Sequence, residues 1–290
     1  MQTMLVDNKA RNEEGVGPAR RRAYPLGYSG DEFKRLELQG ALLHDLTEDV
    51  LRRAGIAPGM RVLDVGCGVG DVSILAGALV GSSGKVLGID RSPDAITVAT
   101  RRVAATGQHW VRFAATEIEG FSTRTTFDAV VGRLILMYLP DPAATLRQLC
   151  SHVRPGGIVA FQEMAMPLAR CVPEGELFCR CMGWLMDAFV RAGFEVDMGG
   201  KLFATFGACG LPPPHMIAGS RMEGGVDSPV YEYLASTLRS LLPMMERYGI
   251  ATAADVDIET LAARLRLEAV SHNASVMPPP LIGAWTRLPA

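Results

Sequence analysis

The feature that most constrains the fold of this 290-residue chain is the run Arg61–Gly70, R-V-L-D-V-G-C-G-V-G. It begins with apolar residues, ends with glycines on alternate positions, and leads directly into a helix-like run, Val72–Val80. This pattern predicts a buried parallel strand, a tight turn and the N-terminus of a helix. Glycines at such a turn allow positive φ angles and the close approach of a ligand.

The spacing of the glycines separates two classes of cofactor. A dinucleotide fingerprint has the form G-x-G-x-x-G and sets the helix N-terminus against a pyrophosphate. Here Gly66, Gly68 and Gly70 follow one another too closely, and Asp71 stands where that motif has glycine. A carboxylate at the helix entrance repels a pyrophosphate. Together with Asp64, which comes two residues before the first glycine, it favours a ligand with a cationic end.

The motif D-x-G-x-G-x-G resembles the first motif of the class I S-adenosylmethionine (SAM)-dependent methyltransferases. The resemblance implies an α/β fold with a doubly wound, seven-stranded, mostly parallel Rossmann-like sheet, and SAM as the cofactor. A second strand-like run ends in Asp90, about 20 residues after the turn, where an acid can accept both ribose hydroxyls of an adenosine. A non-catalytic SAM-binding protein would fit the same residues, whereas the glycine spacing disfavours an NAD-dependent dehydrogenase.

Strand-like and helix-like runs alternate after the glycine turn. Such alternation predicts βαβ units and a parallel sheet covered on both faces. Ser92-Pro93 and Asp141-Pro142 each predict a helix start, with an N-cap residue followed by proline in the first turn. The predicted strands after the first are Lys85–Asp90, Trp110–Ala114, Phe127–Gly132 and Ile158–Glu163, and Leu281–Arg287 closes the sheet as an antiparallel strand by resemblance.

Composition and the resemblance together divide the chain into five parts. We expect a flexible N-terminal arm (1–22), an N-terminal helical lid (23–57), a SAM-binding core (58–227), a helical substrate cover (228–275) and the final strand of the core sheet (276–290). The arm could be exchanged between subunits of a homodimer.

The resemblance also implies cofactor contacts beyond the glycine turn and Asp90. Arg91 follows the second strand directly, and Thr116, Glu117 and Ile118 follow the third strand, where relatives hold the adenine. Arg133 follows the fourth strand and either pairs with the carboxylate of SAM or points outward. In the front helix Gln39, which lies one turn after Arg35, is placed to hold the methionine end.

Glu163 is the strongest candidate for the chemistry. It ends the fifth strand, at the edge where ligands gather in open α/β sheets, and its neighbours Phe161 and Met164 are apolar. There it could accept a proton or stabilise a carbocation. By resemblance, Tyr24 and Tyr28 could assist by closing over the methyl group.

Other motifs narrow the substrate. The fourth-strand loop lacks the D/N-P-P-Y pattern of methyltransferases that act on amino groups of nucleic-acid bases or glutamine. Its L-P-D-P start and the later R-P-G-G turn resemble the ubiquinone/menaquinone and sterol branch, and the front stretch Y-P-L-G-Y-S-G-D-E-F-K-R-L-E-L-Q is similar to bacterial natural-product tailoring enzymes. This implies C-methylation of an indole or prenyl carbon, with O-methylation of a phenol or enol as the alternative.

Composition excludes several other classes of protein. The net charge is -2, which does not suggest a nucleic-acid partner. No apolar stretch approaches the roughly 20 residues of a membrane span, and no secretory signal begins the chain. The six cysteines form no C-x-x-C pair and no histidine stands at zinc-ligand spacing, so we expect free thiols, no metal and a cytoplasmic location.

Overall fold

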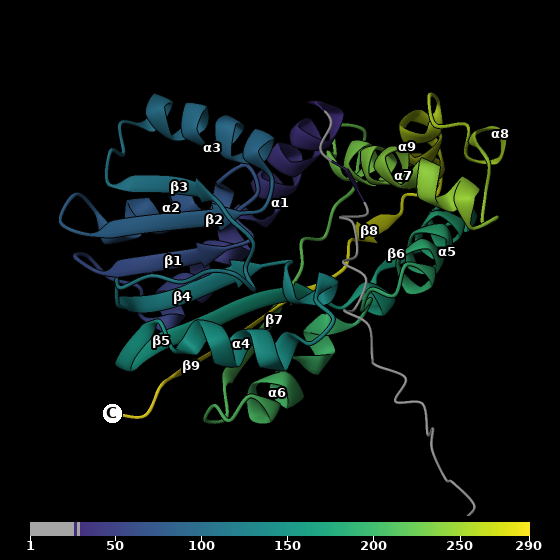
Figure 1. Ribbon diagram of the computed structural model, residues 1–290. Helices are drawn as coiled ribbons and strands as arrows, with labels where there is room; N and C mark the ends of the chain where they lie inside the picture. The colour runs from purple at the N-terminus through teal and green to yellow at the C-terminus, as the bar shows by residue number, and fades with distance from the viewer. Residues whose placement is uncertain (1–25, 28–29) are drawn as a thin grey trace, which may run out of the picture.

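The computed structural model describes residues 26–27 and 30–290. A core built on a seven-stranded sheet lies beside a cover made mainly of helices, and the C-terminus ends at the core (Figure 1). The predicted arm at 1–22 and two candidate site residues, Tyr24 and Tyr28, lie outside the described residues.

The core sheet has the strand order β3-β2-β1-β4-β5-β9-β7. The first five of these strands are mutually parallel, and β9 is antiparallel to both β5 and β7. The prediction of a doubly wound sheet with an antiparallel last strand is therefore confirmed. The strands are β1 (Arg61–Val65), β2 (Lys85–Asp90), β3 (Val111–Ala115), β4 (Phe127–Arg133), β5 (Val153–Met164), β7 (His215–Gly219) and β9 (Leu281–Arg287).

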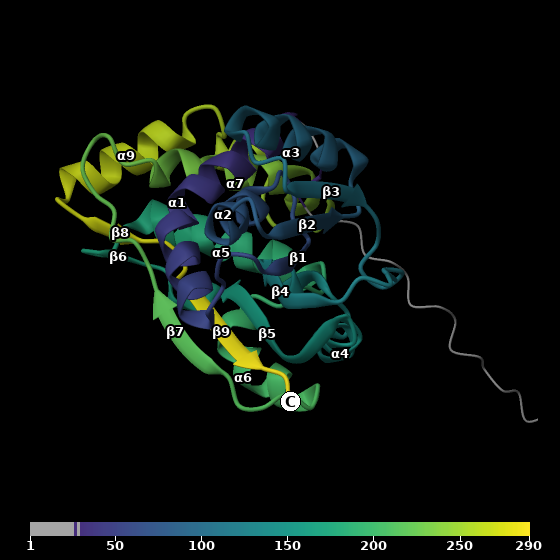
Figure 2. The same cartoon turned by 90° about the vertical axis from the view of Figure 1, so that its left-hand side faces the viewer.

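Helices cover both faces of this sheet (Figures 1 and 2). One face carries α1 (Gly30–Ala54), α2 (Asp71–Val80) and α3 (Pro93–Thr106), and the other carries α4 (Pro142–Cys150) and α6 (Met198–Ala208). Both predicted helix starts are confirmed. The Ser92 hydroxyl accepts the Ala95 N–H at 3.2 Å, and the Asp141 carboxylate accepts the Ala144 N–H at 2.9 Å.

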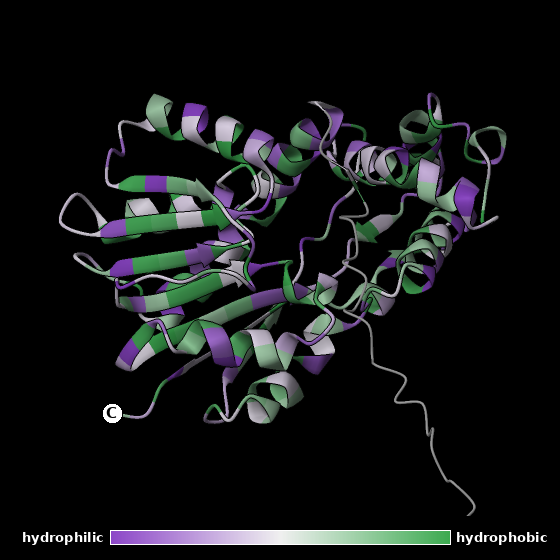
Figure 3. Cartoon of the chain, viewed as in Figure 1, coloured by the Kyte–Doolittle hydropathy of each residue, from purple (hydrophilic) through white to green (hydrophobic). Residues whose placement is uncertain are grey.

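The strands are apolar along most of their length because helices cover both of their faces (Figure 3). In β1, the side chains of Val62, Leu63 and Val65 are fully buried. Burial of such side chains stabilises the fold by about 1.5–3 kcal/mol each. The carboxyl ends of β1, β2 and β4 consequently meet at one edge, held at fixed positions by a packed core.

The cover is larger than the predicted range 228–275. It comprises α5 (Glu176–Arg191), α7 (Val230–Arg247), α8 (Ala253–Val256) and α9 (Leu261–Ser271), with a small sheet of β6 (Arg170–Val172) and β8 (Ser275–Met277). Helix α5 falls inside the predicted core range 58–227 but packs against α7 and α9. Two short 3₁₀ turns, η1 (Leu136–Tyr138) and η2 (Met166–Leu168), lead toward the cover.

Helix α1 joins the core to the cover. It packs on α2 and β9 of the core and on α7 of the cover. Its approach to α2 is close at Gly40, where any Cβ would fall on the carboxylate of Asp71. Within the described residues, no helix combines the length and the apolar character that crossing a membrane requires.

Candidate functional site

The glycine turn has the backbone that the sequence predicts. Gly66, Gly68 and Gly70 all have positive φ, at 67°, 52° and 91°. An L side chain rarely adopts such angles, so glycine is required at these positions. At Gly68 the nearest atom to a hypothetical Cβ is Leu36 Cδ1 at 3.8 Å, an ordinary van der Waals contact, so the positive φ rather than crowding favours glycine there.

Asp90 fastens the end of β2 to this turn. Its Oδ2 accepts the Gly68 N–H at 3.0 Å, and its Oδ1 accepts the Ser92 N–H at 2.9 Å. Burial raises the pKa of this carboxyl, and the two backbone N–H groups oppose that shift. A carboxylate oxygen can accept more than one hydrogen bond, so Asp90 retains acceptor capacity at the edge of the turn.

Asp64 lies inside β1 and is almost completely buried. Its Oδ2 accepts the Ser73 hydroxyl at 2.5 Å, whereas Oδ1 is buried without a hydrogen-bond partner among the described residues. Burial raises the pKa of Asp64 to about 7. An unpartnered buried oxygen is costly, so this atom fits a ligand that supplies a donor or a positive charge.

Asp71 is the first residue of α2, and its carboxylate forms an ion pair. Arg102 donates to its Oδ1 at 2.8 Å and to the Val69 carbonyl at 2.6 Å. The carboxylate also lies against Gly40 of α1. Because Arg102 offsets its charge, Asp71 repels a pyrophosphate less than the sequence alone suggests, and the glycine geometry is the firmer distinction.

The residues predicted near the adenine gather beside Asp90. The Thr116 N–H donates to the Asp90 carbonyl at 2.8 Å, which joins the ends of β2 and β3. Ile118 is buried, and its carbonyl accepts from the Gln148 amide at 3.1 Å. Arg91 and Glu117 are exposed at the same edge. Arg91 thus follows Asp90 directly in the chain, and Thr116, which begins the segment with Glu117 and Ile118, is held beside Asp90.

Arg133 ends β4 and reaches toward α1. Its Nη1 donates to the Thr47 hydroxyl at 2.9 Å. Burial lowers the pKa of Arg133, while Asp71 and Asp64 oppose that shift. The side chain is thus neither fully turned outward nor isolated, and it contributes positive charge close to Asp64.

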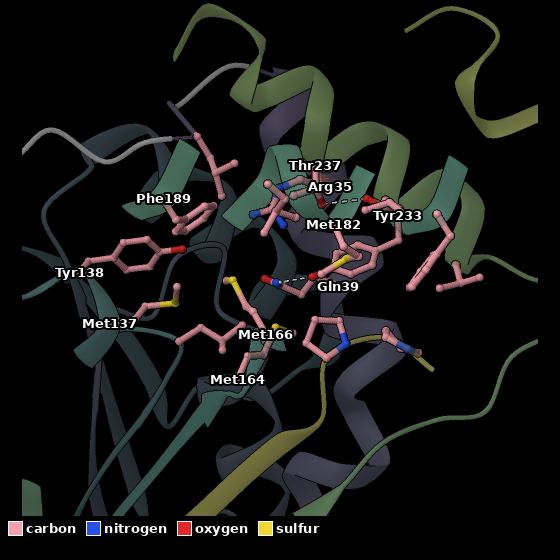
Figure 4. A pocket seen from close by; sticks show the side chains of 18 residues that line it. Arg35, Gln39, Met137, Tyr138, Met164, Met166, Met182, Phe189, Tyr233 and Thr237 are labelled. Carbon is pink, nitrogen blue, oxygen red and sulfur yellow. Dashed lines mark hydrogen bonds between the residues drawn. The ribbon is translucent and has the colours of Figure 1, made fainter. Parts of the chain in front are cut away.

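A pocket lies between the carboxyl edge of the core and the cover (Figure 4). Core residues from η1 and the end of β5 form one wall, and α5, α7 and α1 form the others. Apolar side chains dominate, which is typical of sites for small organic molecules. They include Met137, Met164, Met166, Phe178, Met182 and Phe189.

One end of this pocket is polar. The Gln39 amide donates to the Tyr233 hydroxyl at 2.8 Å, and Thr237 lies one helical turn further along α7 (Figure 4). Arg35, also on the lining, forms a two-bond ion pair with Glu32, at 2.6 and 2.7 Å. Gln39, predicted to hold the methionine end of the cofactor, therefore hydrogen-bonds across the pocket to the cover.

Glu163 is fully buried, and its side chain is not part of the pocket lining. Its Oε1 accepts the Ile135 N–H at 2.9 Å and the Leu136 N–H at 2.7 Å. Burial raises the pKa of Glu163 to about 8, although these N–H groups oppose the shift. Its contacts are thus with the loop after β4.

Sequence reasoning missed the residues that the cover contributes. Tyr233 and Thr237 come from α7, and Phe178 and Phe189 from α5. Nothing local in the sequence distinguishes pocket-facing aromatic residues from core residues. On α1, Arg35 did carry a signal, because it lies one turn from Gln39 on the same face of the helix.

Known proteins match the part of the chain that contains the glycine turn. Residues 56–188 match the family described as methyltransferase domain. A demethylmenaquinone methyltransferase from Geobacillus stearothermophilus is 33% identical over 125 residues, which cover 41% of this chain and 52% of that protein. A ubiquinone biosynthesis O-methyltransferase from Aromatoleum aromaticum is 38% identical over 132 residues, covering 45% and 53%. The chain thus spans about half the length of these curated relatives.

The fold extends beyond this match. The crystal structure of a putative methyltransferase from Bacillus halodurans superposes with a TM-score of 0.55 at 15% identity, covering 84% of this chain and 99% of that one. At this identity the likeness shows a shared fold. The class I methyltransferase architecture is therefore present, with the glycine turn, Asp90 and the pocket placed around its carboxyl edge.

Proposed function

We propose that this chain, whose residues 56–188 match the methyltransferase domain family, transfers a methyl group from SAM to a small, largely apolar molecule. One arrangement carries the proposal. Ile135 packs on Gly66 of the glycine turn, while the adjacent Leu134 and Met137 line the pocket. A cofactor at the turn and a substrate in the pocket would therefore be neighbours.

The charges around the turn support SAM as the cofactor. Asp90 is the acceptor for ribose hydroxyls, with Arg91 and Thr116–Ile118 beside it on the nucleoside side. The unpartnered Oδ1 of Asp64 suits a cationic end, and Arg133 nearby suits a carboxylate. When bound, SAM supplies an electrophilic methyl group on its sulfonium.

The chain itself acts by positioning and by excluding water. Methyl transfer is an in-line displacement, for which holding the nucleophile in line with the methyl group is the main requirement. Apolar walls from η1, α5 and α7 surround the substrate space and keep water out. The lid residues Tyr24 and Tyr28 stay predictions as further contributors.

The polar end of the pocket indicates what the substrate carries. Arg35 is paired with Glu32, so these two side chains together add no net charge. A substrate carboxylate would lose its hydration there without gaining an unpaired cation, whereas a hydroxyl, carbonyl or ring N–H would find partners in Gln39 and Tyr233. We therefore favour an uncharged substrate with one polar end.

Carbon is the favoured methyl acceptor. The described side chains that line the pocket include no histidine, aspartate or glutamate that could deprotonate a phenol. An indole or prenyl carbon can attack without prior deprotonation, and the cation that results then releases its proton to water. O-methylation of a phenol or enol is the second candidate, because one of the relatives is an O-methyltransferase by name.

The test uses SAM with a labelled methyl group. The protein is incubated with a panel of uncharged indoles, prenylated compounds, phenols and quinols, and the position of the label is found by NMR. Label on carbon supports the proposal. Label on oxygen replaces the carbon version and keeps the enzyme class. SAM binding without turnover on any member favours a non-catalytic SAM-binding protein.

A further inference from the structure

We infer that Glu163 is a positioning residue, which fixes the loop between β4 and α4 so that this loop can serve the glycine turn and the pocket at once. The inference departs from the expectation that Glu163 exchanges a proton with the substrate. It rests on the proposed function only where turnover is measured, because turnover presupposes that the chain transfers a methyl group.

The first observation is the pair of hydrogen bonds from the loop. Glu163 Oε1 accepts the N–H groups of Ile135 and Leu136 at 2.9 and 2.7 Å. These groups begin η1, where N–H groups lack partners within the turn itself and need an external acceptor. Ile135 stands at the N-cap position of η1 and has no side-chain oxygen for this purpose. The carboxyl from β5 supplies it.

The second observation is the conformation of the loop. Leu134 has a φ of 55°, in the left-handed region that a leucine rarely occupies. Its N–H donates to the Gln162 carbonyl at 2.8 Å. Gln162 and Glu163 thus hold three consecutive N–H groups of the loop, which offsets the strain at Leu134.

The third observation is what the loop contacts. A Cβ placed on Gly66 would lie 2.7 Å from Ile135 Cδ1, so the Ile135 side chain covers the first glycine of the turn. On either side of it, Leu134, Met137 and Tyr138 face the pocket. A loop released from Glu163 would therefore disturb both binding regions together.

The burial of Glu163 agrees with this role. Its side chain is fully buried and is absent from the pocket lining. Burial raises its pKa to about 8, so the neutral form predominates at pH 7. A neutral carboxyl still offers one carbonyl-type oxygen to the loop. Glutamine offers the same kind of oxygen but cannot exchange a proton with a substrate. The Glu163→Gln variant therefore distinguishes a positioning role from a proton-exchange role.

The test compares Glu163→Gln with Glu163→Ala. Hydrogen exchange of the Ile135 and Leu136 amides is measured first, because it needs no ligand. We expect protection in the wild type and in Glu163→Gln, and its loss in Glu163→Ala. SAM affinity by calorimetry should change less than about twofold for Glu163→Gln and fall about tenfold for Glu163→Ala, which loses two hydrogen bonds. Turnover by Glu163→Gln should stay within about threefold of the wild type.

Glu268→Ala is the matched control. Glu268 of α9 accepts the Leu177 and Phe178 N–H groups at 2.7 and 3.1 Å, so it caps α5 in the same way but on the cover. We expect this variant to lose stability and to keep its SAM affinity. Thermal unfolding of all variants separates global destabilisation from the effect on the loop.

Three results would overturn the inference. These are unprotected Ile135 and Leu136 amides in the wild type, equal SAM affinities for Glu163→Ala and Glu268→Ala, and abolished turnover in Glu163→Gln with intact SAM binding. The last result would assign proton exchange to Glu163. If the wild type neither binds nor uses SAM, the proposed function fails, and the exchange measurement alone decides the role of Glu163.

Discussion

The Asp90 carboxylate accepts the Gly68 N–H at 3.0 Å, and this bond joins the end of β2 to the glycine turn. We predict that Asp90→Ala weakens SAM binding by about 1–3 kcal/mol, because hydrogen bonds to a charged group are lost. Calorimetry measures the affinity. Asp94→Ala, at an exposed position in the first turn of α3, is the control and should bind SAM normally. An Asp90→Ala affinity equal to that of the control would contradict the ribose assignment.

The contact of Ile135 with Gly66 leads to a second prediction. Gly66→Ala forces an L residue into positive φ and also sets its Cβ against Ile135. Gly107→Ala is a matched control, with a φ of 72° and no atom within 4 Å of the added Cβ. Both variants should lose about 1 kcal/mol of stability from the backbone, and Gly66→Ala about 1–3 kcal/mol more from overpacking. Urea unfolding measures the difference, and equal losses would argue against close packing at the turn.

The buried pair between Glu32 and Arg35 permits a prediction on stability. Arg35→Met removes the guanidinium that is bonded to the buried Glu32 carboxylate and should cost about 3–5 kcal/mol. The double variant Glu32→Gln/Arg35→Met should recover part of this loss. On the same helix, the exposed pair of Arg53 and Asp49 lies at 2.7 Å, and Arg53→Met should change stability by less than about 1 kcal/mol. Denaturant unfolding of these variants checks the contrast, and an equal loss from the two single variants would contradict it.

The hydrogen bond between Gln39 and Tyr233 leads to a prediction about substrate binding. Removing the Tyr233 hydroxyl in Tyr233→Phe takes away an acceptor at the polar end of the pocket. We expect KM for the methyl acceptor to rise about threefold to tenfold, with KM for SAM unchanged. Tyr231→Phe is the control, because that hydroxyl donates to the Gly225 carbonyl outside this pocket. A rise in KM for SAM alone would instead place this end of the pocket at the cofactor.

The buried carboxyls predict how stability depends on pH. The pKa of Glu163 is about 8 in the folded protein, against an ordinary value of 4.5. Between these values the folded state keeps a proton that the unfolded state has lost, so the free energy of unfolding falls as pH rises. Below about pH 4.5 and above about pH 8 the contribution is constant.

The Glu163→Gln variant has no group at this position that binds a proton on folding. Between pH 5 and pH 9, the free energy of unfolding of the wild type should therefore fall, relative to that of Glu163→Gln, by an amount on the order of 3–5 kcal/mol. Asp64, with a pKa of about 7, adds a slope of the same sign in both proteins. Urea unfolding at several pH values measures the difference. Parallel curves would contradict the raised pKa of Glu163.

The sequence predicted the parts of the molecule that local patterns determine. The apolar runs marked the core strands along the chain, and alternate glycines marked the turn that joins β1 to α2. The caps at Ser92 and Asp141 follow from side-chain chemistry within three residues. These features depend on neighbours in the chain, so one sequence is enough to find them.

Long-range contacts could not be predicted in this way. Asp71 is paired with Arg102 from α3, and Arg133 donates to Thr47 from α1. The sequence placed Glu163 at the end of the fifth strand, as the structure does, but its hydrogen bonds to the loop depend on how β4 and β5 lie side by side. Similarly, nothing in the sequence indicates that α5 packs with α7.

The position of α1 has a consequence for exchanging parts between related proteins. Its Gln39 and Glu32 hydrogen-bond to Tyr233 and Ser240 of α7, while its Gly40 fits against Asp71 of the core. A chimaera that took only its cover from a related protein would bring a foreign helix against these side chains. Substrate preference should therefore be transferable only when α1 is exchanged together with the cover. The two distant segments of the chain then act as a single module.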